Sequence, residues 1–348
     1  MNIFIRVDTH IKIGIGHIYR CLKLLSYLEE EHNIVFICKK YNNLNSDEQQ
    51  FMDNIYDKIR TKYLIKFIEI DNDNKIKKDD MKTWMGEDYK LDAYKTIDHL
   101  KNCNILIVDH YAIDFNWESL VKNSTEKLII IEDFIGRKHN CDIIINGIVN
   151  EPLIYKELVN KDCKLFLGNE YLIVGNQFFN QDITLREKNR ISIFISGSDN
   201  TNETCKIINN IKEFNKNNKY NFDIIVGGLN PCYKDILNLC TEDYFKVYYN
   251  IDNIAEIFNK SYISIGAIGQ GLLERIALKI PSIIISLTEN QLLVSKDLIN
   301  SECFEYMGNI PIDYSKLINK IEHIEHNYNN IILKCEGFFK YNKLKNII

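Results

Sequence analysis

The residues best suited to chemistry in this chain follow an apolar run near its start. Arg6-Val7-Asp8 ends that run, and the turn Gly14-Ile15-Gly16-His17 leads into a segment with helical spacing. The two glycines would let a ligand approach backbone N–H groups at the start of a helix, where the partial positive charge favours anions. A neutral imidazole can accept a proton from water, so His17 is a candidate general base. Alternatively, His17 only caps the helix or packs within the turn.

Sites for common cofactors are not expected. A dinucleotide-binding turn, Gly-x-Gly-x-x-Gly, needs a third glycine, which the segment after Gly16 lacks. The ten cysteines are scattered, without a Cys-x-x-Cys pair or a close Cys/His cluster, so the ligand spacing that zinc requires is absent. We therefore expect reduced thiols, no metal centre and no bound cofactor.

Polar side chains also follow two later strands of the first half. Asp109-His110-Tyr111 follows one apolar run, and Glu132-Asp133 follows the next. Because polar residues at the carboxyl ends of buried parallel strands point into a shared crevice, these residues could reach the same ligand as His17. Alternatively, Asp109 caps the following helix and Tyr111 packs in the core. For Glu132-Asp133 a structural role is favoured, since adjacent carboxylates diverge on a turn.

Two turns in the second half could hold phosphate. The apolar run that ends at Ile195 is followed by Ser196-Gly197-Ser198-Asp199, whose small residues leave room for a phosphate on backbone N–H groups. The turn Gly266-Ala267-Ile268-Gly269-Gln270-Gly271 opens another helix. A diphosphate there would leave Glu274 able to accept hydrogen bonds from both hydroxyls of a ribose. Alternatively, the glycines only form a turn, and Glu274 only favours the helix dipole.

A last polar turn, Thr288-Glu289-Asn290-Gln291, follows the apolar run 282–287. The amides of Asn290 and Gln291 can both donate and accept hydrogen bonds, which suits sugar hydroxyls and acetamido groups. They could instead cap the helix that follows.

Alternating strands and helices must position these turns. Short runs rich in Ile and Val recur, each followed by a polar turn and a helical pattern, which indicates an α/β fold with parallel strands. Between the first two runs, the apolar spacing predicts one helix face made of Ile18, Cys21, Leu22, Leu25 and Leu28. The predicted strands cover residues 3–7, 34–38, 65–70, 105–108, 128–131 and 143–145, then 191–195, 222–226, 245–248, 262–265 and 282–287.

The domain organisation follows from a polar stretch at residues 176–190, which interrupts the series of strands. We expect an N-terminal Rossmann-like domain over residues 1–175, which carries the general base, and a C-terminal Rossmann-like domain over 190–325. A helical tail over 326–348 would follow. Two open-sheet domains in series predict a ligand cleft between them, because ligands bind beyond the carboxyl ends of the strands.

The composition excludes several other classes of protein. The chain has 348 residues, 45% of them hydrophobic, which is enough for two ordinary cores and argues against disorder. Its 43 Lys and Arg against 48 Asp and Glu give a net charge of −5, so no field would attract nucleic acid or an anionic membrane. No apolar run approaches the ~18 residues that span a bilayer, and the first residues lack a signal-peptide pattern. We expect a cytoplasmic protein.

Six ordered blocks carry a resemblance to a known family. They are Arg6-x-Asp8 with Gly14-x-Gly16-His17-x-x-Arg20-Cys21-Leu22; Asp92-Ala93-x-x-Thr96; Val108-Asp109-His110-Tyr111-x-x-Asp114-x-x-Trp117-Glu118; Glu132-Asp133 with Arg137-x-His139-x-Cys141-Asp142; Gly197-x-Asp199-x-x-Asn202; and Glu274 through Asn290-Gln291. They resemble the UDP-2,4-diacetamido-2,4,6-trideoxy-β-L-altropyranose hydrolases of pseudaminic acid biosynthesis. That family is a branch of the glycosyltransferase-B superfamily. Ser196, Ile268 and Gln270 depart from its glycine and Ser/Thr pattern.

The resemblance implies a glycosyltransferase-B-like fold and a nucleotide-sugar hydrolase that removes UDP from a UDP-2,4-diacetamido-2,4,6-trideoxyhexose by attack of water at C1. His17 would be the base. We predict sugar contacts by Asp8, Gly14, Gly16, Arg20, Tyr111, Asn290 and Gln291, and UDP contacts by Gly197, Ser198, Asp199, Ile268, Gly269, Gln270, Gly271 and Glu274. Two alternatives stay open: a UDP-sugar-dependent glycosyltransferase of the same fold, and a non-catalytic UDP-sugar-binding subunit. The sequence indicates neither the exact sugar nor an oligomeric state.

Overall fold

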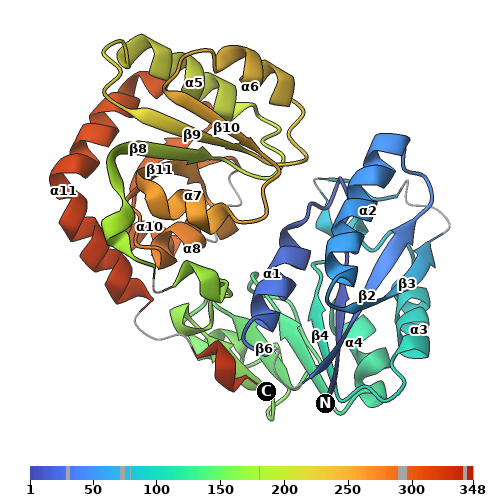
Figure 1. Ribbon diagram of the computed structural model, residues 1–348. Helices are drawn as coiled ribbons and strands as arrows, with labels where there is room; N and C mark the ends of the chain where they lie inside the picture. Colours follow the sequence, from blue (N-terminus) through green and yellow to red (C-terminus); the bar gives the residue numbers. More distant parts are fainter. Residues whose placement is uncertain are drawn as a thin grey trace. The chain divides into compact units, whose positions relative to one another are not determined.

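The computed structural model of the chain describes residues 1–28, 32–70, 75–78, 80–179, 181–288, 296–339 and 343–347. The chain divides into two compact units, of which unit 1 is Met1–Ile173 with Asn342–Ile348 and unit 2 is Val174–Tyr341. In Figure 1, unit 1 runs from blue to green with its last residues in red, and unit 2 runs from green to red. The polar residues 176–189 therefore belong to unit 2.

A seven-stranded parallel sheet forms the centre of unit 1, in the order β3-β2-β1-β4-β5-β6-β7. Its strands are β1 (Asn2–Val7), β2 (Asn33–Tyr41), β3 (Leu64–Ile70), β4 (Ile105–Asp109), β5 (Lys127–Ile131), β6 (Ile143–Asn146) and β7 (Lys164–Leu167). The six strands predicted in this half are confirmed. The sequence pattern does not predict β7, because this edge strand is only four residues long and its side chains are not fully buried.

Helices cover both faces of this sheet. They are α1 (Gly16–Leu25), α2 (Ser46–Arg60), α3 (Tyr89–His99) and α4 (Phe115–Val121). Along β1, Ile3 and Ile5 pack with residues of α1 and α2, whereas Phe4 packs with residues of α3 and α4. Because alternate residues of a strand point to opposite faces, α1 and α2 lie on one face and α3 and α4 on the other.

Unit 2 has a six-stranded parallel sheet in the order β10-β9-β8-β11-β12-β13. Its strands are β8 (Glu187–Phe194), β9 (Asn221–Val226), β10 (Phe245–Tyr249), β11 (Ser261–Ala267), β12 (Ser282–Ser286) and β13 (Glu305–Asn309). Its described helices are α5 (Glu203–Phe214), α6 (Tyr233–Leu239), α7 (Ile254–Lys260), α8 (Gln270–Ala277), α10 (Lys296–Asn300) and α11 (Leu317–Phe338). The long α11 runs along one side of the unit in Figure 1. Both units are α/β and Rossmann-like, which confirms the predicted fold class.

Three features of the second half differ from the sequence pattern. β8 begins at Glu187, earlier than the predicted residue 191. The apolar pattern does not indicate this start, because the first residues of the strand are polar and exposed. β13 has no apolar run to reveal it. A tail that begins at residue 326 would split α11, which is continuous, and only residues 343–347 pack in unit 1, through Leu344 and Ile347.

The strand order places one reversal of winding in each sheet. In unit 1 the chain passes from β1 to β2 on one side and later reaches β4 on the other side of β1. Open α/β sheets bind ligands at such a point, beyond the carboxyl ends of the two flanking strands. In unit 2 the matching point lies between β8 and β11. The segments at these four strand ends carry His17, Asp109, Asp199 and Gly269.

A fully buried set of charges supports the carboxyl end of β1. Arg6 donates hydrogen bonds of 2.6 and 2.9 Å to Asp8 and one of 2.7 Å to Asp92. Asp92 also accepts a 2.7 Å bond from the indole of Trp117 and lies 2.9 Å from the ammonium group of Lys39. Burial raises the pKa of Asp92, but the charges of Arg6 and Lys39 lower it by a larger amount, so the net pKa is about 2. These ionised groups tie β1 to β2, α3 and α4.

Replacing Asp92 with Asn should therefore destabilise the protein, because Arg6 and Lys39 would keep buried charges with one fewer carboxylate. We expect the free energy of unfolding to fall by about 3–5 kcal/mol in urea denaturation at pH 7. The matched variant D57N removes the exposed Asp57–Arg60 pair and should change it little.

The same pair of variants gives a test in acid. Since the folded pKa of Asp92 is about 2, below its ordinary value of 3.8, its stabilisation is complete above about pH 4 and is lost as the pH falls towards 2. The difference between wild type and D92N should shrink over that range. A difference that is absent at pH 7, or that does not shrink in acid, would contradict this assignment.

Candidate active site

The glycines before α1 set the position of its first turn. Gly14 has a φ of +90°, which would strain a residue with a side chain, and its N–H donates to the carbonyl of His10 over 2.7 Å. α1 then begins at Gly16, without a side-chain cap and without an acidic residue in its first turn. His17 lies in this turn, and Arg20 follows three positions later, so both side chains share one side of the helix.

His17 and Arg20 converge on one carboxylate, that of Asp109 at the end of β4. Nδ1 of His17 lies 2.6 Å from Oδ1 of Asp109, and Arg20 donates to both oxygens over 2.6 and 2.8 Å. Asp109 is fully buried, and His17 and Arg20 are 8% and 7% exposed. Asp109 does not cap the next helix, because the residue that caps α4 is Asp114.

This geometry fixes which nitrogen of His17 carries the proton in the neutral ring. An ionised carboxylate only accepts hydrogen bonds, so the 2.6 Å contact with Asp109 requires a proton on Nδ1. Nη2 of Arg20 lies 3.3 Å from the same Nδ1, but two donors do not bond to each other, so that contact is not a hydrogen bond. Nε2 is then the basic nitrogen. Within the described ranges, no residue forms a hydrogen bond with Nε2.

Asp109 remains ionised despite its burial. Burial raises its pKa, but Arg20 and then His17 lower it, and the net pKa lies well below the ordinary carboxyl value. A buried carboxylate of this kind orients an imidazole and stabilises the imidazolium that forms when the ring takes up a proton. The pair therefore makes His17 chemically competent to remove a proton from water.

Asp133 extends the cluster from Arg20 to Tyr111. Its Oδ2 accepts hydrogen bonds from Nη1 of Arg20 and from the hydroxyl of Tyr111, and its side chain is 18% exposed. The ring of Tyr111 meets His17 edge-on, with centroids 4.3 Å apart, and stacks on Trp84. Burial and the negative charge of Asp133 raise the pKa of Tyr111 well above its ordinary value, so the phenol stays protonated.

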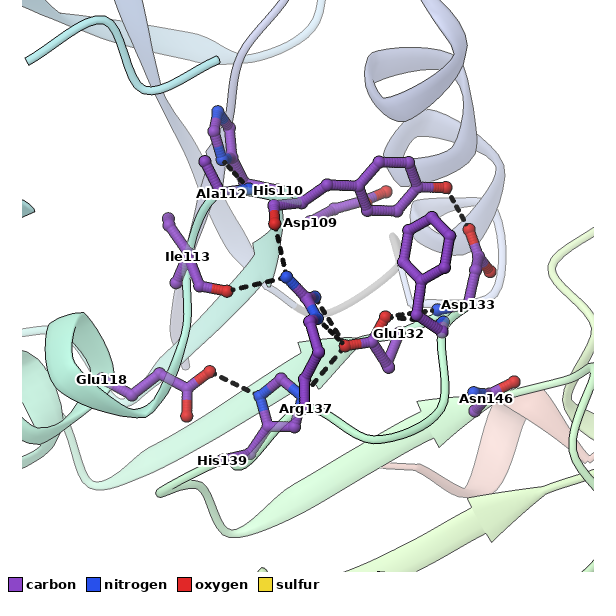
Figure 2. A network of polar contacts seen from close by, with 12 residues as sticks. Asp109, His110, Ala112, Ile113, Glu118, Glu132, Asp133, Arg137, His139 and Asn146 are labelled. Atoms are coloured by element: carbon purple, nitrogen blue, oxygen red, sulfur yellow. Dashed lines mark hydrogen bonds and ion pairs between the residues drawn. The ribbon is translucent and has the colours of Figure 1, made fainter. Parts of the chain in front are cut away.

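A second polar network holds the turn that carries Asp133, as Figure 2 shows. Oε1 of Glu132 accepts two backbone N–H groups of its own turn over 2.8 Å, including that of Asp133. Oε2 of Glu132 accepts from Arg137 over 2.7 Å and from His139 over 2.9 Å. The other ring nitrogen of His139 bonds to Glu118 over 2.7 Å. The structural role favoured for Glu132 is therefore confirmed, whereas Asp133 belongs to the cluster around His17.

His139 differs from His17 in the charge that it carries. Burial lowers the pKa of His139, but the hydrogen bonds and charges of Glu118 and Glu132 raise it to about 9. His139 is thus an imidazolium bound at both nitrogens and is not available as a base. Arg137 also donates to the carbonyl of Tyr111, which joins this network to the cluster around His17.

The residues predicted to contact a sugar have different positions in unit 1. Gly14 and Gly16 form the turn before His17, and Arg20 and Tyr111 belong to its cluster. Asp8 is fully buried, and its oxygens are bound by Arg6 and by the backbone N–H of Lys39 over 2.9 Å. In this structure Asp8 supports the strand end, and its contact with a sugar stays a prediction. Asn290 and Gln291 lie outside the described residues.

In unit 2, Asp199 is also a supporting residue. Its carboxylate accepts the backbone N–H groups of Glu203 over 3.0 Å and Thr204 over 2.9 Å at the start of α5, and it is 1% exposed. Both oxygens therefore bind the start of the helix, and a UDP contact by Asp199 stays a prediction. Gly197 and Ser198 are only partly buried in the same loop, so they stay available to a ligand.

The turn between β11 and α8 separates accessible from buried positions. Gly269 is exposed, has a φ of +144°, and a Cβ added there would meet no atom within 4 Å. Gln270 and Gly271 are partly buried at the first two positions of α8. The side chain of Ile268 is 7% exposed and packs in the core, and its contact with UDP stays a prediction. Glu274 is 5% exposed, one turn into the helix.

Sequence reasoning missed the contacts that join distant segments. The His17–Asp109 hydrogen bond spans 92 positions of the chain, and no local pattern predicts such a pairing. The ring centroids of Trp84 and His17 lie 6.1 Å apart, but Trp84 lies in no recognisable motif. In the described part of the chain, no group of three or more His, Cys, Asp or Glu side chains is arranged to hold a metal ion. The described helices include none that is both long and apolar enough to cross a membrane.

Two curated proteins are similar in sequence to this chain, although no family model matches it. An uncharacterized protein of Methanocaldococcus jannaschii is 27% identical over an alignment of 336 residues, and the match covers 92% of this chain and 59% of that protein. The chain thus spans little more than half of that relative. The UDP-2,4-diacetamido-2,4,6-trideoxy-β-L-altropyranose hydrolase of Campylobacter jejuni is 23% identical over 265 residues. The match covers 75% of this chain and 82% of the hydrolase.

Solved structures share the fold over almost the whole chain. MurG of Acinetobacter baumannii superimposes with a TM-score of 0.61 at 10% identity, covering 99% of this chain and 96% of MurG. UGT2 of Phytolacca americana, solved with UDP-2-fluoro-glucose and pterostilbene, gives 0.66 at 8% identity, covering 97% of this chain and 93% of UGT2. The chain therefore has the glycosyltransferase-B fold, as the sequence resemblance implies.

The buried imidazolium can be tested directly by NMR. Because the pKa of His139 is raised to about 9, its ring should stay protonated at neutral pH, and its stabilising contribution should be lost only as the pH rises through 9. A histidine ring ¹H–¹⁵N titration of wild type and E118Q measures this, and removal of one carboxylate should lower the titration midpoint. A wild-type midpoint near the ordinary 6.5 would contradict the network's charge assignment.

Proposed function

We propose that the protein is a nucleotide-sugar hydrolase that releases UDP from a UDP-2,4-diacetamido-2,4,6-trideoxyhexose, in the biosynthesis of a pseudaminic-acid-type sugar. The observation that carries the proposal is the 2.6 Å contact of His17 with a buried, ionised Asp109, which leaves Nε2 as the basic nitrogen. The similarity to the Campylobacter jejuni hydrolase supports the choice of substrate, and the fold supports a nucleotide sugar.

The proposed chemical step is a displacement by water at C1 of the sugar. The water oxygen forms a bond to C1 while the bond between C1 and the oxygen of the β-phosphate breaks. UDP leaves with the electron pair of that bond, and Nε2 of His17 takes a proton from the attacking water. Asp109 then holds the imidazolium through Nδ1, and general-base catalysis of this kind typically contributes about 10²–10⁴-fold to the rate.

The nucleotide would bind in unit 2, at the switch point of its sheet. The diphosphate would lie on the N–H groups of Gly269, Gln270 and Gly271 at the start of α8, with the ribose near Glu274. Donors aimed at the charge that develops on the leaving group contribute roughly 3 kcal/mol each to the rate. The proposal requires that this turn and His17 face the same substrate molecule when the reaction occurs.

A glycosyltransferase is the second candidate function. It is favoured by the fold neighbours, among which UGT2 was solved with a fluorinated UDP-glucose and a second ligand. The same base would then take its proton from an acceptor hydroxyl instead of water. The two candidates differ in one requirement, since a hydrolase releases UDP without any added acceptor.

Purified protein incubated with a UDP-2,4-diacetamido-2,4,6-trideoxyhexose alone should therefore release UDP and free sugar. In H₂¹⁸O the label should appear in the sugar and not in UDP, as mass spectrometry of both products will show, because water attacks C1. Replacing His17 with Gln should lower kcat by about 10²–10⁴-fold. The control H323Q changes an exposed histidine of α11, with a side chain 56% exposed, and should retain full activity.

Three outcomes would point elsewhere. UDP release only after an acceptor is added would favour the glycosyltransferase. Binding of UDP without turnover of any of several UDP-diacetamido sugars would favour a binding subunit. Wild-type rates in H17Q would remove His17 from the mechanism.

A further inference from the structure

A buried arginine lies against the glycine turn that opens α8. Arg275 is 1% exposed, although it carries a charge. Its Nε donates to the hydroxyl of Ser264 over 2.7 Å, and its Nη2 donates to the carbonyl of Phe194 over 2.6 Å. The guanidinium carbon lies 4.7 Å from the centroid of the Phe258 ring. Phe194 and Ser264 belong to β8 and β11, so the guanidinium lies at the switch point of the sheet.

Two glycines of the turn make room for this side chain. A Cβ added at Gly266 would lie 2.4–2.7 Å from three guanidinium atoms of Arg275, and one added at Gly271 would lie 2.9 Å from its Nη1. Real Cβ contacts are not so close, so neither position accepts a larger residue while Arg275 stays in place. Gly269 is different, because a Cβ there would meet nothing within 4 Å. Gly266 and Gly271 thus make room for Arg275, whereas the space beside Gly269 is open.

The charge of Arg275 is not balanced in the way that the other buried arginines are. Arg6 and Arg20 both form ion pairs with carboxylates, whereas Arg275 forms none among the described residues. Its Nη1 is buried and, among the residues that the structure describes, has no hydrogen-bond partner. Burial lowers the pKa of Arg275 to about 10, against an opposing effect of Glu274, so the group is still charged at neutral pH. An unpaired buried charge is costly, which suggests that its partner is a ligand.

We propose that Arg275 is the positioning residue of an anion site at the start of α8, where its unbalanced charge attracts the diphosphate of a bound nucleotide. The anion would lie on the N–H groups of Gly269, Gln270 and Gly271, and Arg275 would act on it through the turn that it holds. The site has two sources of positive potential, the helix N-terminus and a guanidinium shielded from water, where charge interactions are less screened. The choice of a uridine nucleotide rests on the proposed function, and the preference for a diphosphate rests on Arg275.

The test compares the affinity of UDP with that of uridine, measured by isothermal titration calorimetry. Replacing Arg275 with Met removes the charge and keeps a long apolar side chain. The ratio of UDP to uridine affinity should fall by about 10-fold or more, and the affinity for uridine should change little, because a unit charge within a few ångströms of a diphosphate acts only on the charged ligand. A merely structural role would lower both affinities together.

The matched control is R186M in the same unit. Arg186 also donates to backbone carbonyls, those of Leu278 and Lys279, but no glycine of the turn lies against it. Its variant should leave the UDP-to-uridine ratio unchanged. The variant R275K keeps the charge and should keep the preference for UDP even if R275M does not fold. An R275M protein that folds with the wild-type ratio, or a folded R275K protein without a preference for UDP, would overturn the proposal.

The same measurements separate this inference from the proposed function. If the wild-type protein binds UDP through Arg275 but hydrolyses no UDP-sugar, the anion site is supported and the hydrolase proposal is contradicted. If the protein hydrolyses the UDP-sugar but the ratio of UDP to uridine affinity does not depend on Arg275, the hydrolase is supported and the role of Arg275 is contradicted. Wild-type protein that binds neither UDP nor uridine would overturn both.

Discussion

The candidate active site depends on one buried carboxylate that must remain ionised. Asp109 has no access to water, and its charge is tolerated because Arg20 supplies the opposite charge and His17 donates a hydrogen bond. This constraint sets requirements on the elements around Asp109. α1 must present both side chains one turn apart, and β4 must end in an acid beside β1, where the register pairs Val7 with Asp109. Asp133 accepts a hydrogen bond from Nη1 of Arg20 and so adds a second negative charge beside the guanidinium. Glu132 in turn accepts the backbone N–H of Asp133 and holds it in position.

Several other polar residues of the sequence motifs are bound by protein partners. Asp8 and Asp92 neutralise Arg6, and Asp199 accepts backbone N–H groups at the start of α5. Such residues have the types that catalysis uses, but their atoms are already occupied by protein partners, so they fix the strand ends from which the exposed residues project. The glycines of the turn between β11 and α8 also differ in role, since Gly266 and Gly271 accommodate Arg275 and Gly269 stays open.

The strands were largely predictable because apolar runs of β-branched residues are a local signal, and eleven strands could be placed from them. β7 and β13 could not, since a short or polar edge strand has no such run. For the site, the sequence pattern singled out His17, Asp109 and Tyr111 at strand ends, but it could not pair them. His17 and Asp109 lie 92 positions apart in the sequence, and only the folded structure brings them together. In addition, an aspartate that binds a ligand cannot be told in the sequence from an aspartate that binds an arginine.

The tautomer of His17 tests the central claim most directly. Ring ¹⁵N NMR of selectively labelled wild-type protein and of D109N reports which nitrogen is protonated. The account predicts that neutral His17 carries its proton on Nδ1 and that this proton gives the strongly deshielded ¹H signal of a short hydrogen bond. D109N should lose this proton signal while it retains the fold. A proton on Nε2 in the wild type, or a His17 spectrum that D109N leaves unchanged, would contradict it.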